Sequence, residues 1–170
     1  MADRSRGEAD LVLFSERLAN SASFGTLFRE GMDLVEETAA YLDGDGRAEA
    51  RALDRATSVT YATESMRLTT RLMQIASWLL LHRAVKEGEM TLVQANREKT
   101  KVKLTAADPG AAELIAQLPP RLQDLVRRSM DLQTRVRRLD TSIHMSALKQ
   151  GVPGNPLLPQ IDRLRAAFER

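Results

Sequence analysis

The sequence predicts an all-α protein, an antiparallel three-helix bundle with short accessory helices and a C-terminal extension. Aromatic residues make up only 4% of the 170 residues, whereas β-sheets depend on aromatic and β-branched strands. Three long stretches instead repeat apolar residues at steps of three and four, the period of an amphipathic helix. We therefore expect a bundle domain over residues 23–148, between an N-terminal arm (1–22) and an extension (149–170).

The first long helix is predicted to begin at Ser23, a candidate N-cap, and to end at the turn formed by residues 43–46. This turn alternates aspartates with glycines as calcium loops do, but Arg47 stands where the fifth residue of such a loop is a ligand. We therefore interpret it as a plain turn. Residues 47–56 are good helix formers without a clear apolar stripe, so they form either a short linking helix or the start of the next one.

The second long helix is the strongest prediction and covers about residues 58–87, up to Gly88. Two neighbouring apolar rows predict a central helix that contacts two others. The rows consist of Val59, Ala62, Met66, Thr69, Met73, Ala76 and Leu80, and of Tyr61, Ser65, Leu68, Leu72, Ile75 and Leu79.

The third long helix follows Pro119 and Pro120 and runs to about residue 148. Its apolar seam alternates steps of three and four, as in a coiled coil. The seam consists of Leu122, Leu125, Ser129, Leu132, Val136, Leu139 and Ile143. Before this helix, Thr91 and Gln94 form a capping-box pattern that opens a short basic helix, and Pro109 is expected to begin a brief helix.

Composition and motifs exclude several classes of protein. The chain has no cysteine, so disulfide scaffolds and thiolate metal sites are excluded. No phosphate-binding loop or nucleophile elbow is present, so we expect no enzymatic activity, no catalytic residue, no metal and no cofactor. The longest apolar run is far shorter than the about 20 residues of a membrane span, and no signal peptide opens the chain. These features predict a cytoplasmic protein without a membrane partner.

Charge is distributed unevenly along the chain. Residues 1–60 sum to −5 and residues 91–170 to +6, within a net charge of +2. The basic second half leaves open a helical DNA-binding or transcription-associated protein as the alternative function. Aspartates interrupt the arginines, and no aromatic residue lies between Leu79 and Ala167 to stack an unpaired base. Nucleic acid is therefore an unlikely partner.

A polar stripe on the second long helix is a candidate protein-interaction surface. The acids of the first helix, Asp33, Glu36 and Glu37, have the charge needed to pair with its arginines, so the stripe could instead hold the two helices together. Further along the same helix the stripe becomes apolar, as contact surfaces do. In the extension, three apolar residues at steps of three and four form a second amphipathic segment. The candidate residues are Glu64, Arg67, Arg71, Gln74, Trp78, Leu81, Ile161, Leu164 and Phe168.

The second long helix also carries a family resemblance. Its string YATESMRLTTRLMQIASWLLLHRAV (61–85), followed by EGEM (87–90), resembles the signature of the RcdA family, alphaproteobacterial regulators of CtrA degradation. FREGMDLVEE (28–37) and YLD (41–43) resemble the family's first helix.

The resemblance implies a small, dimeric, cytoplasmic adaptor. Such an adaptor helps deliver cell-cycle regulatory substrates to the ClpXP protease, together with other adaptor or response-regulator proteins, and cuts nothing itself. We also expect a homodimer from the residues, because one bundle cannot bury every apolar row. The seam of the third helix and the pair Trp78 and Leu81 are the predicted contact surfaces.

Overall fold

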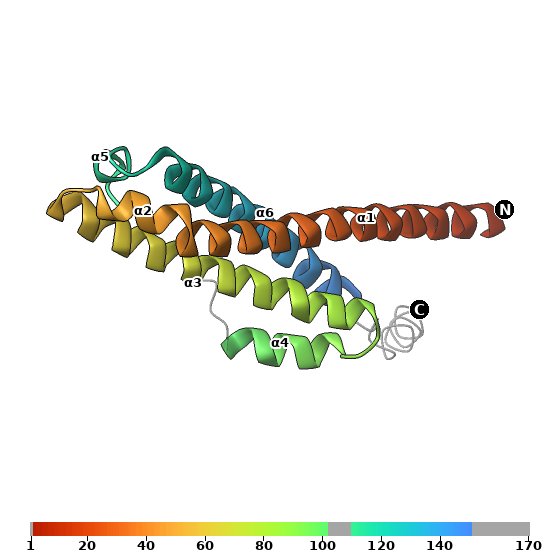
Figure 1. The fold of residues 1–170 in the computed structure, drawn as a ribbon. Coiled ribbons are helices and arrows are strands. Elements are labelled where there is room, and N and C mark those ends of the chain that lie inside the picture. The colour runs from red at the N-terminus through yellow and green to blue at the C-terminus, as the bar shows by residue number, and fades with distance from the viewer. Residues whose placement is uncertain (1, 102–109, 151–170) are drawn as a thin grey trace, which may run out of the picture. The chain divides into compact units, whose positions relative to one another are not determined.

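The computed structural model describes the backbone of residues 2–101 and 110–150, and the side chains of residues 21–99 and 110–143. These residues form six helices and no strand, as Figure 1 shows: α1 (Ala2–Asp43), α2 (Asp45–Arg51), α3 (Arg55–Lys86), α4 (Leu92–Lys101), α5 (Ala112–Ile115) and α6 (Pro120–Gln150). The predicted all-α bundle of three long helices with short accessory helices is confirmed. The chain divides into two compact units, with the boundary between Gln133 and Thr134. Among the described helices, none is both long and apolar enough to cross a membrane.

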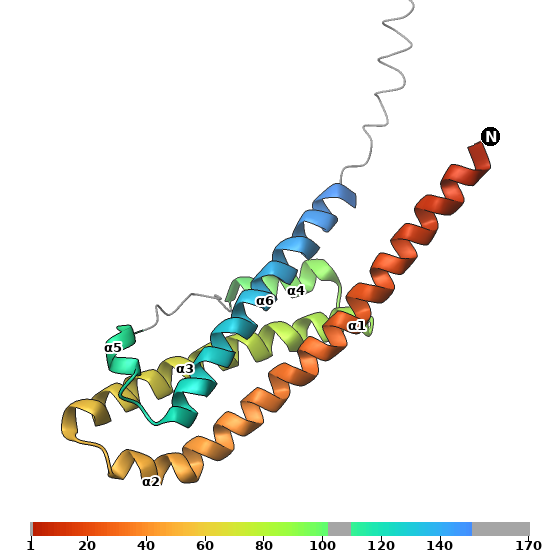
Figure 2. The ribbon, with the colours of Figure 1, turned by 90° about the horizontal axis from the view of Figure 1, so that it is seen from above.

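The long helices of the first unit do not all alternate in direction. Lys86 at the end of α3 donates a hydrogen bond to the Ser21 carbonyl of α1, whereas the start of α3 lies near the end of α1, so these helices are antiparallel. Arg121 and Arg128 of α6 pair with Asp45 and Glu37, so α6 is also antiparallel to α1. It follows that α3 and the first half of α6 run parallel, which corrects the fully antiparallel prediction. The physical reason is the connection: α4 packs against α3 and carries the chain back along it (Figures 1 and 2).

Side-chain caps mark the starts of α3 and α4. Asp54 caps α3, since its carboxylate accepts hydrogen bonds from the amide and the hydroxyl of Thr57 at 2.8 and 3.1 Å. These bonds also lower the pKa of Asp54, because they favour the charged carboxylate. The predicted capping box before α4 is confirmed: Gln94 accepts from the Thr91 amide, and the Gln94 amide donates to the Thr91 hydroxyl.

The predicted start of the first helix at Ser23 is wrong. The backbone is helical from Ala2 through Asp43, so the predicted boundary between arm and bundle falls inside α1. Residues 2–22 contain mainly good helix formers and no proline, so a serine alone does not end the helix there. Of the predicted brief helix near Pro109, only α5 lies within the described residues. The whole C-terminal segment from residue 151, with Ile161, Leu164 and Phe168, lies outside them.

The linking helix α2 is fixed to both of its neighbours. The Tyr41 hydroxyl donates a 2.6 Å hydrogen bond to Glu49 of α2, and burial and this bond raise the pKa of Tyr41. A methyl group on Gly46 would lie 2.7 Å from both the Tyr41 carbonyl and the Tyr61 hydroxyl. Gly46 therefore permits the close approach that turns the chain from α1 into α3.

Candidate protein-interaction surface

The interior face of α3 carries an unexpected row of side chains. Glu64, Arg71 and Trp78 follow one another at seven-residue steps, and each is only 2% exposed. A step of seven residues keeps side chains on one face of a helix. All three members of this row are therefore buried, although two of them are charged.

Glu64 lies next to the backbone of Gly110, shortly before α5. Its Oε1 atom accepts a 2.6 Å hydrogen bond from Arg67, which is half-exposed. A Cβ atom on Gly110 would lie 2.5 Å from the same oxygen. A larger residue at position 110 would therefore have to displace the Glu64 carboxylate.

Arg71 joins α3 to α6. Its Nη1 atom donates a 2.8 Å hydrogen bond to the Ser129 hydroxyl, which itself donates to the Val126 carbonyl. Burial lowers the pKa of Arg71, and the negative charge of Glu64 opposes that effect. The predicted pairing of this stripe with the acids of the first helix is therefore wrong: Glu37 pairs instead with Arg128 of α6 at 2.8 Å. The partners were misassigned because Arg71 faces Ser129 of α6 and not the acids of α1.

Trp78 belongs to an aromatic cluster between α1 and α3. Its ring lies 6.3 Å from that of Phe24 and 4.1 Å from the imidazole of His82, measured between centroids. The Lys86 ammonium lies 5.5 Å from the centre of the Phe24 ring. Such contacts fix the end of α3 against α1.

The structure thus separates the six described members of the predicted surface by exposure. Glu64, Arg71 and Trp78 are buried, and Arg67, Gln74 and Leu81 are half-buried. The buried members favour the structural interpretation of the stripe, in which it holds neighbouring helices together. The apolar seam of α6, which was predicted to form a dimer contact, is also mostly buried. Its members from Leu122 to Val136 are buried, and Leu139 and Ile143 are half-buried.

The opposite face of α3 is exposed and apolar. Val59, Met66, Met73 and Leu80 have exposed fractions of 63, 72, 66 and 53%, and they stand seven residues apart. We call these four residues the α3 row. They belong to the first of the two apolar rows that we expected to be buried, so that expectation is wrong for this row. Only the second row, with Leu68, Leu72, Ile75 and Leu79, lies in the core.

The surroundings of the α3 row add to its apolar character. Besides the row itself, the exposed side chains of α3 between Val59 and Leu80 are Ala62, Thr63, Thr69 and Thr70. Every charged side chain of α3 from Glu64 to Arg71 is buried or half-buried. Thr63, Thr69 and Ser77 donate their hydroxyl hydrogens to the carbonyls of Val59, Ser65 and Met73 at 2.8 to 2.9 Å. Because these hydroxyls are satisfied by their own helix, the face offers mostly methyl and thioether groups to a partner.

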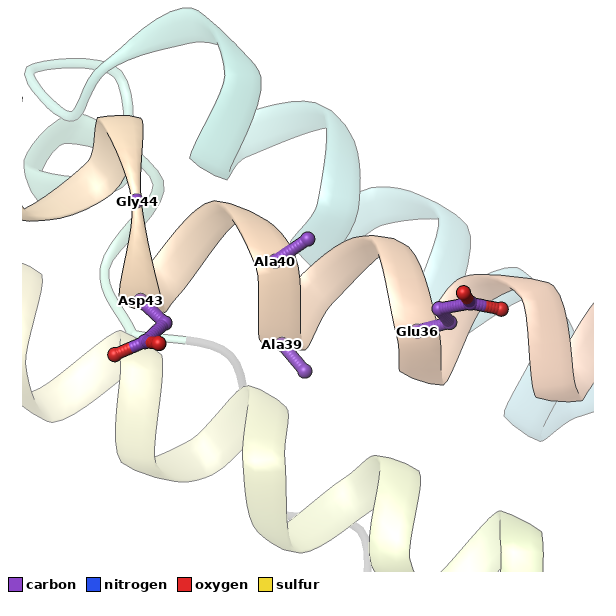
Figure 3. Close-up of a pocket in the computed structure, with 5 residues that line it drawn as sticks. All are labelled: Glu36, Ala39, Ala40, Asp43 and Gly44. Carbon is purple, nitrogen blue, oxygen red and sulfur yellow. The ribbon is translucent and has the colours of Figure 1, made fainter.

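The hollow drawn in Figure 3 has a different composition. It has a volume of about 600 Å³ and is lined by Glu36, Ala39, Ala40, Asp43 and Gly44. In the figure the two carboxylates lie apart, with the alanines between them. Asp43 pairs with Arg47 at 2.8 Å. Among the described residues, no three side chains of the metal-binding types come together.

Comparison with known proteins identifies relatives of the chain. A family described as "Protein of unknown function (DUF1465)" matches residues 15–168. The crystal structure of RcdA from Caulobacter crescentus CB15 matches with 50% sequence identity and a TM-score of 0.57. The match covers 71% of this chain and 91% of that one. Comparison with the curated proteins gave no match. The family match over most of the chain and the 50% identity to RcdA agree with the resemblance carried by residues 61–90, and the chain belongs to the RcdA family.

Proposed function

We propose that this protein is a non-enzymatic cytoplasmic adaptor that helps deliver cell-cycle regulatory substrates to the ClpXP protease. Its partners are the ClpX unfoldase and other adaptor or response-regulator proteins. Membership of the RcdA family supports this role. The single structural observation that carries it is the α3 row, four large apolar side chains that no part of the described chain covers.

A surface of this kind fits protein binding better than binding of a small molecule. The α3 row spans 21 residues, which corresponds to about 31 Å of helix at 1.5 Å per residue. Its four members are uncharged side chains of one helix face, whereas small-molecule sites are concave with a few polar groups inside. Contiguous exposed apolar side chains mark contacts between proteins, and methionine side chains adapt to differently shaped partners.

We infer that a second copy of the chain covers the α3 row. Apolar side chains at seven-residue steps place one stripe along a helix, as in a coiled coil. Ala62, Thr69 and Ala76 stand between the members of the row, and small side chains allow two helices to approach closely. A symmetric dimer buries the same patch on both copies, so the whole length of the row is covered at once.

The dimer is tested by light scattering on the full chain at micromolar concentration. We expect twice the monomer mass of 18.9 kDa for the wild type and the monomer mass for Met66→Glu/Met73→Glu. Val93→Glu is the matched control, since Val93 on α4 is also 63% exposed but lies outside the row, and it should remain a dimer. A wild-type mass of 18.9 kDa, or a dimer that survives the double substitution, would overturn this interface.

The adaptor role is tested with purified proteins. Degradation of a cell-cycle response regulator by ClpXP is measured with and without the full chain, in the presence of companion adaptors. We expect degradation to accelerate when the chain is added, and the chain itself to have no peptidase activity without ClpXP. An unchanged rate, together with no binding to ClpX or to a companion adaptor, would contradict the role. Because this assay does not measure oligomeric state, it can fail while the dimer stands.

A further inference from the structure

We propose that two copies of the protein pair along α3 in opposite directions, so that each large side chain of the α3 row packs onto a small side chain of the second copy. This geometry rests on the dimer proposed above, which leaves the direction of the second α3 open. Three features support it: the alternation of large and small side chains on α3, the symmetry that a dimer imposes, and the charges at the two ends of the helix.

Large and small side chains alternate along the exposed face of α3. The α3 row occupies one position of each heptad. A second position on the same face follows three residues later, and it is also exposed or half-buried. This second position is small in each heptad of the row, where its residues are Ala62, Thr69 and Ala76. A partner helix therefore meets large side chains separated by gaps that its own large side chains can fill.

This alternation does not suit a parallel pair. In a parallel symmetric pair the two-fold axis runs along the helices, so each residue faces its own copy. Met66 and Met73 then face methionines, which hold the helices apart, and Ala62 faces an alanine across the resulting space. Protein interiors rarely contain such voids, so the row disfavours this arrangement.

An antiparallel pair removes the mismatch. Its two-fold axis is perpendicular to α3, so a residue faces a different residue of the second copy. One alignment, with the axis at the level of residue 71, sets a large side chain opposite a small one in successive layers. The facing pairs are then Met66 with Ala76, Met73 with Thr69, and Leu80 with Ala62. All layers have a similar volume, which permits even packing along the row.

The charges at the ends of α3 select this alignment. The heptad pattern continues to Arg55 at the start of α3 and to Glu87 at its C-cap, and both side chains are exposed. With the axis at residue 71, Arg55 faces Glu87 of the second copy at each end of the pair. The neighbouring alignment that also sets large against small places Arg55 opposite the apolar Leu80. Opposite charges therefore favour the first alignment.

Arg83 fits the same alignment. Its Nε atom donates a 2.9 Å hydrogen bond to Oε1 of Glu87 in its own chain, so its charged group points along the helix. Its aliphatic stem then lies opposite Val59 of the second copy, and arginine stems readily cover apolar side chains.

Engineered disulfides test the geometry, because the natural chain has no cysteine. Under mild oxidation Met66→Cys/Ala76→Cys should form a linked dimer of twice the monomer mass, since each new cysteine faces the other type in the second copy. Neither single variant should link, because each cysteine lies about 15 Å along the helix from its own copy, whereas a disulfide needs Cα atoms within about 7 Å. The same distance prevents a bond within one chain.

Ala62→Cys/Met73→Cys is the matched control. It also combines one member of the row with one small position, but these two residues face each other only in the neighbouring alignment, so it should not link. Light scattering under reducing conditions establishes that each variant is a dimer before oxidation, and circular dichroism establishes that its helices are intact.

Charge exchange tests the alignment independently. Arg55→Glu should raise the dissociation constant of the dimer about tenfold, because two pairs of opposite charge become pairs of like charge. Arg55→Glu/Glu87→Arg should restore the affinity. An acidic residue in the first turn of α3 favours the helix, so a loss of affinity in the single variant does not arise from unfolding.

The outcomes separate the geometry from the dimer itself. A wild type that is monomeric by light scattering refutes the dimer and the geometry together. A dimer in which Met66→Cys or Ala76→Cys alone links is parallel, and a dimer in which only the control links has the neighbouring alignment. Either result, or a dimeric Met66→Cys/Ala76→Cys that does not link, overturns the geometry and leaves the dimer standing.

Discussion

Removing each of the two buried charges of α3 is expected to change the stability of the protein in opposite directions. Arg71→Met removes a guanidinium whose Nε and Nη2 atoms have no hydrogen-bond partner in the structure, and methionine fills similar space. Ser129 keeps its hydrogen bond to Val126, and Glu64 keeps Arg67 at 2.6 Å. Replacing buried ionic groups by well-packed apolar side chains is often neutral or stabilising when no charge is left without a counter-charge, and Arg67 still neutralises Glu64 in this variant. We therefore expect Arg71→Met to unfold at an equal or higher temperature.

Glu64→Gln should have the reverse effect. It preserves the shape of the side chain but removes the negative charge that opposes the desolvation of Arg71. A buried charge left without its counter-charge costs about 3–5 kcal/mol. At about 2–4 °C for each kcal/mol in a chain of this size, the melting temperature should fall by roughly 6–20 °C.

Urea denaturation followed by circular dichroism measures both effects. The variant Glu64→Gln/Arg71→Met supplies the control, because without the buried cation the lost carboxylate matters little and most of the stability should return. Equal losses of stability in the two single variants would refute the reasoning, since they would show that Glu64 and Arg71 act as one mutually stabilising pair.

Two further predictions concern glycine and acid positions. Gly25→Ala should raise the melting temperature slightly, because the added Cβ meets nothing within 4 Å in α1. Gly46→Ala should lower the melting temperature, because the added Cβ would lie 2.7 Å from the Tyr41 carbonyl. Thermal denaturation that shifts both melting temperatures in the same direction would contradict this. Because the pKa of Asp54 is lowered, its carboxylate stabilises the folded state fully when the pH is above the ordinary pKa of 3.8. This contribution is lost as the pH falls through the lowered pKa. Asp54→Ala should therefore melt below the wild type at pH 7, and the two melting curves should converge on acidification; a gap that stays constant with pH would exclude this role of the charge.

Features that depend on nearby residues could be predicted from the sequence, and features that depend on distant ones could not. The capping box at Thr91 and the approximate ends of α3 follow from side chains within one turn. The orientation of α3 about its own axis does not, because the hydrogen-bond partner of the buried Arg71 is Ser129, which lies 58 residues away in the sequence. Hydropathy alone therefore assigned the α3 row to the core. The seven-residue spacing of that row does not distinguish it, because the buried Glu64, Arg71 and Trp78 have the same spacing.

The separation between Arg71 and Ser129 also has a consequence for the order of folding. α1 and α3 meet across the short turn that contains α2, so they can associate as a helical hairpin before α6 arrives, since contacts across short loops form with the smallest loss of chain entropy. In that hairpin the guanidinium of Arg71 is still hydrated. It loses its water only when α6 docks, so the free-energy cost of this desolvation belongs to the docking step. This cost reduces the net gain in free energy when α6 docks. In native-state hydrogen exchange, the amides of α6 around Ser129 should open at lower free energy than those of α3 around Leu72, without unfolding of the whole chain.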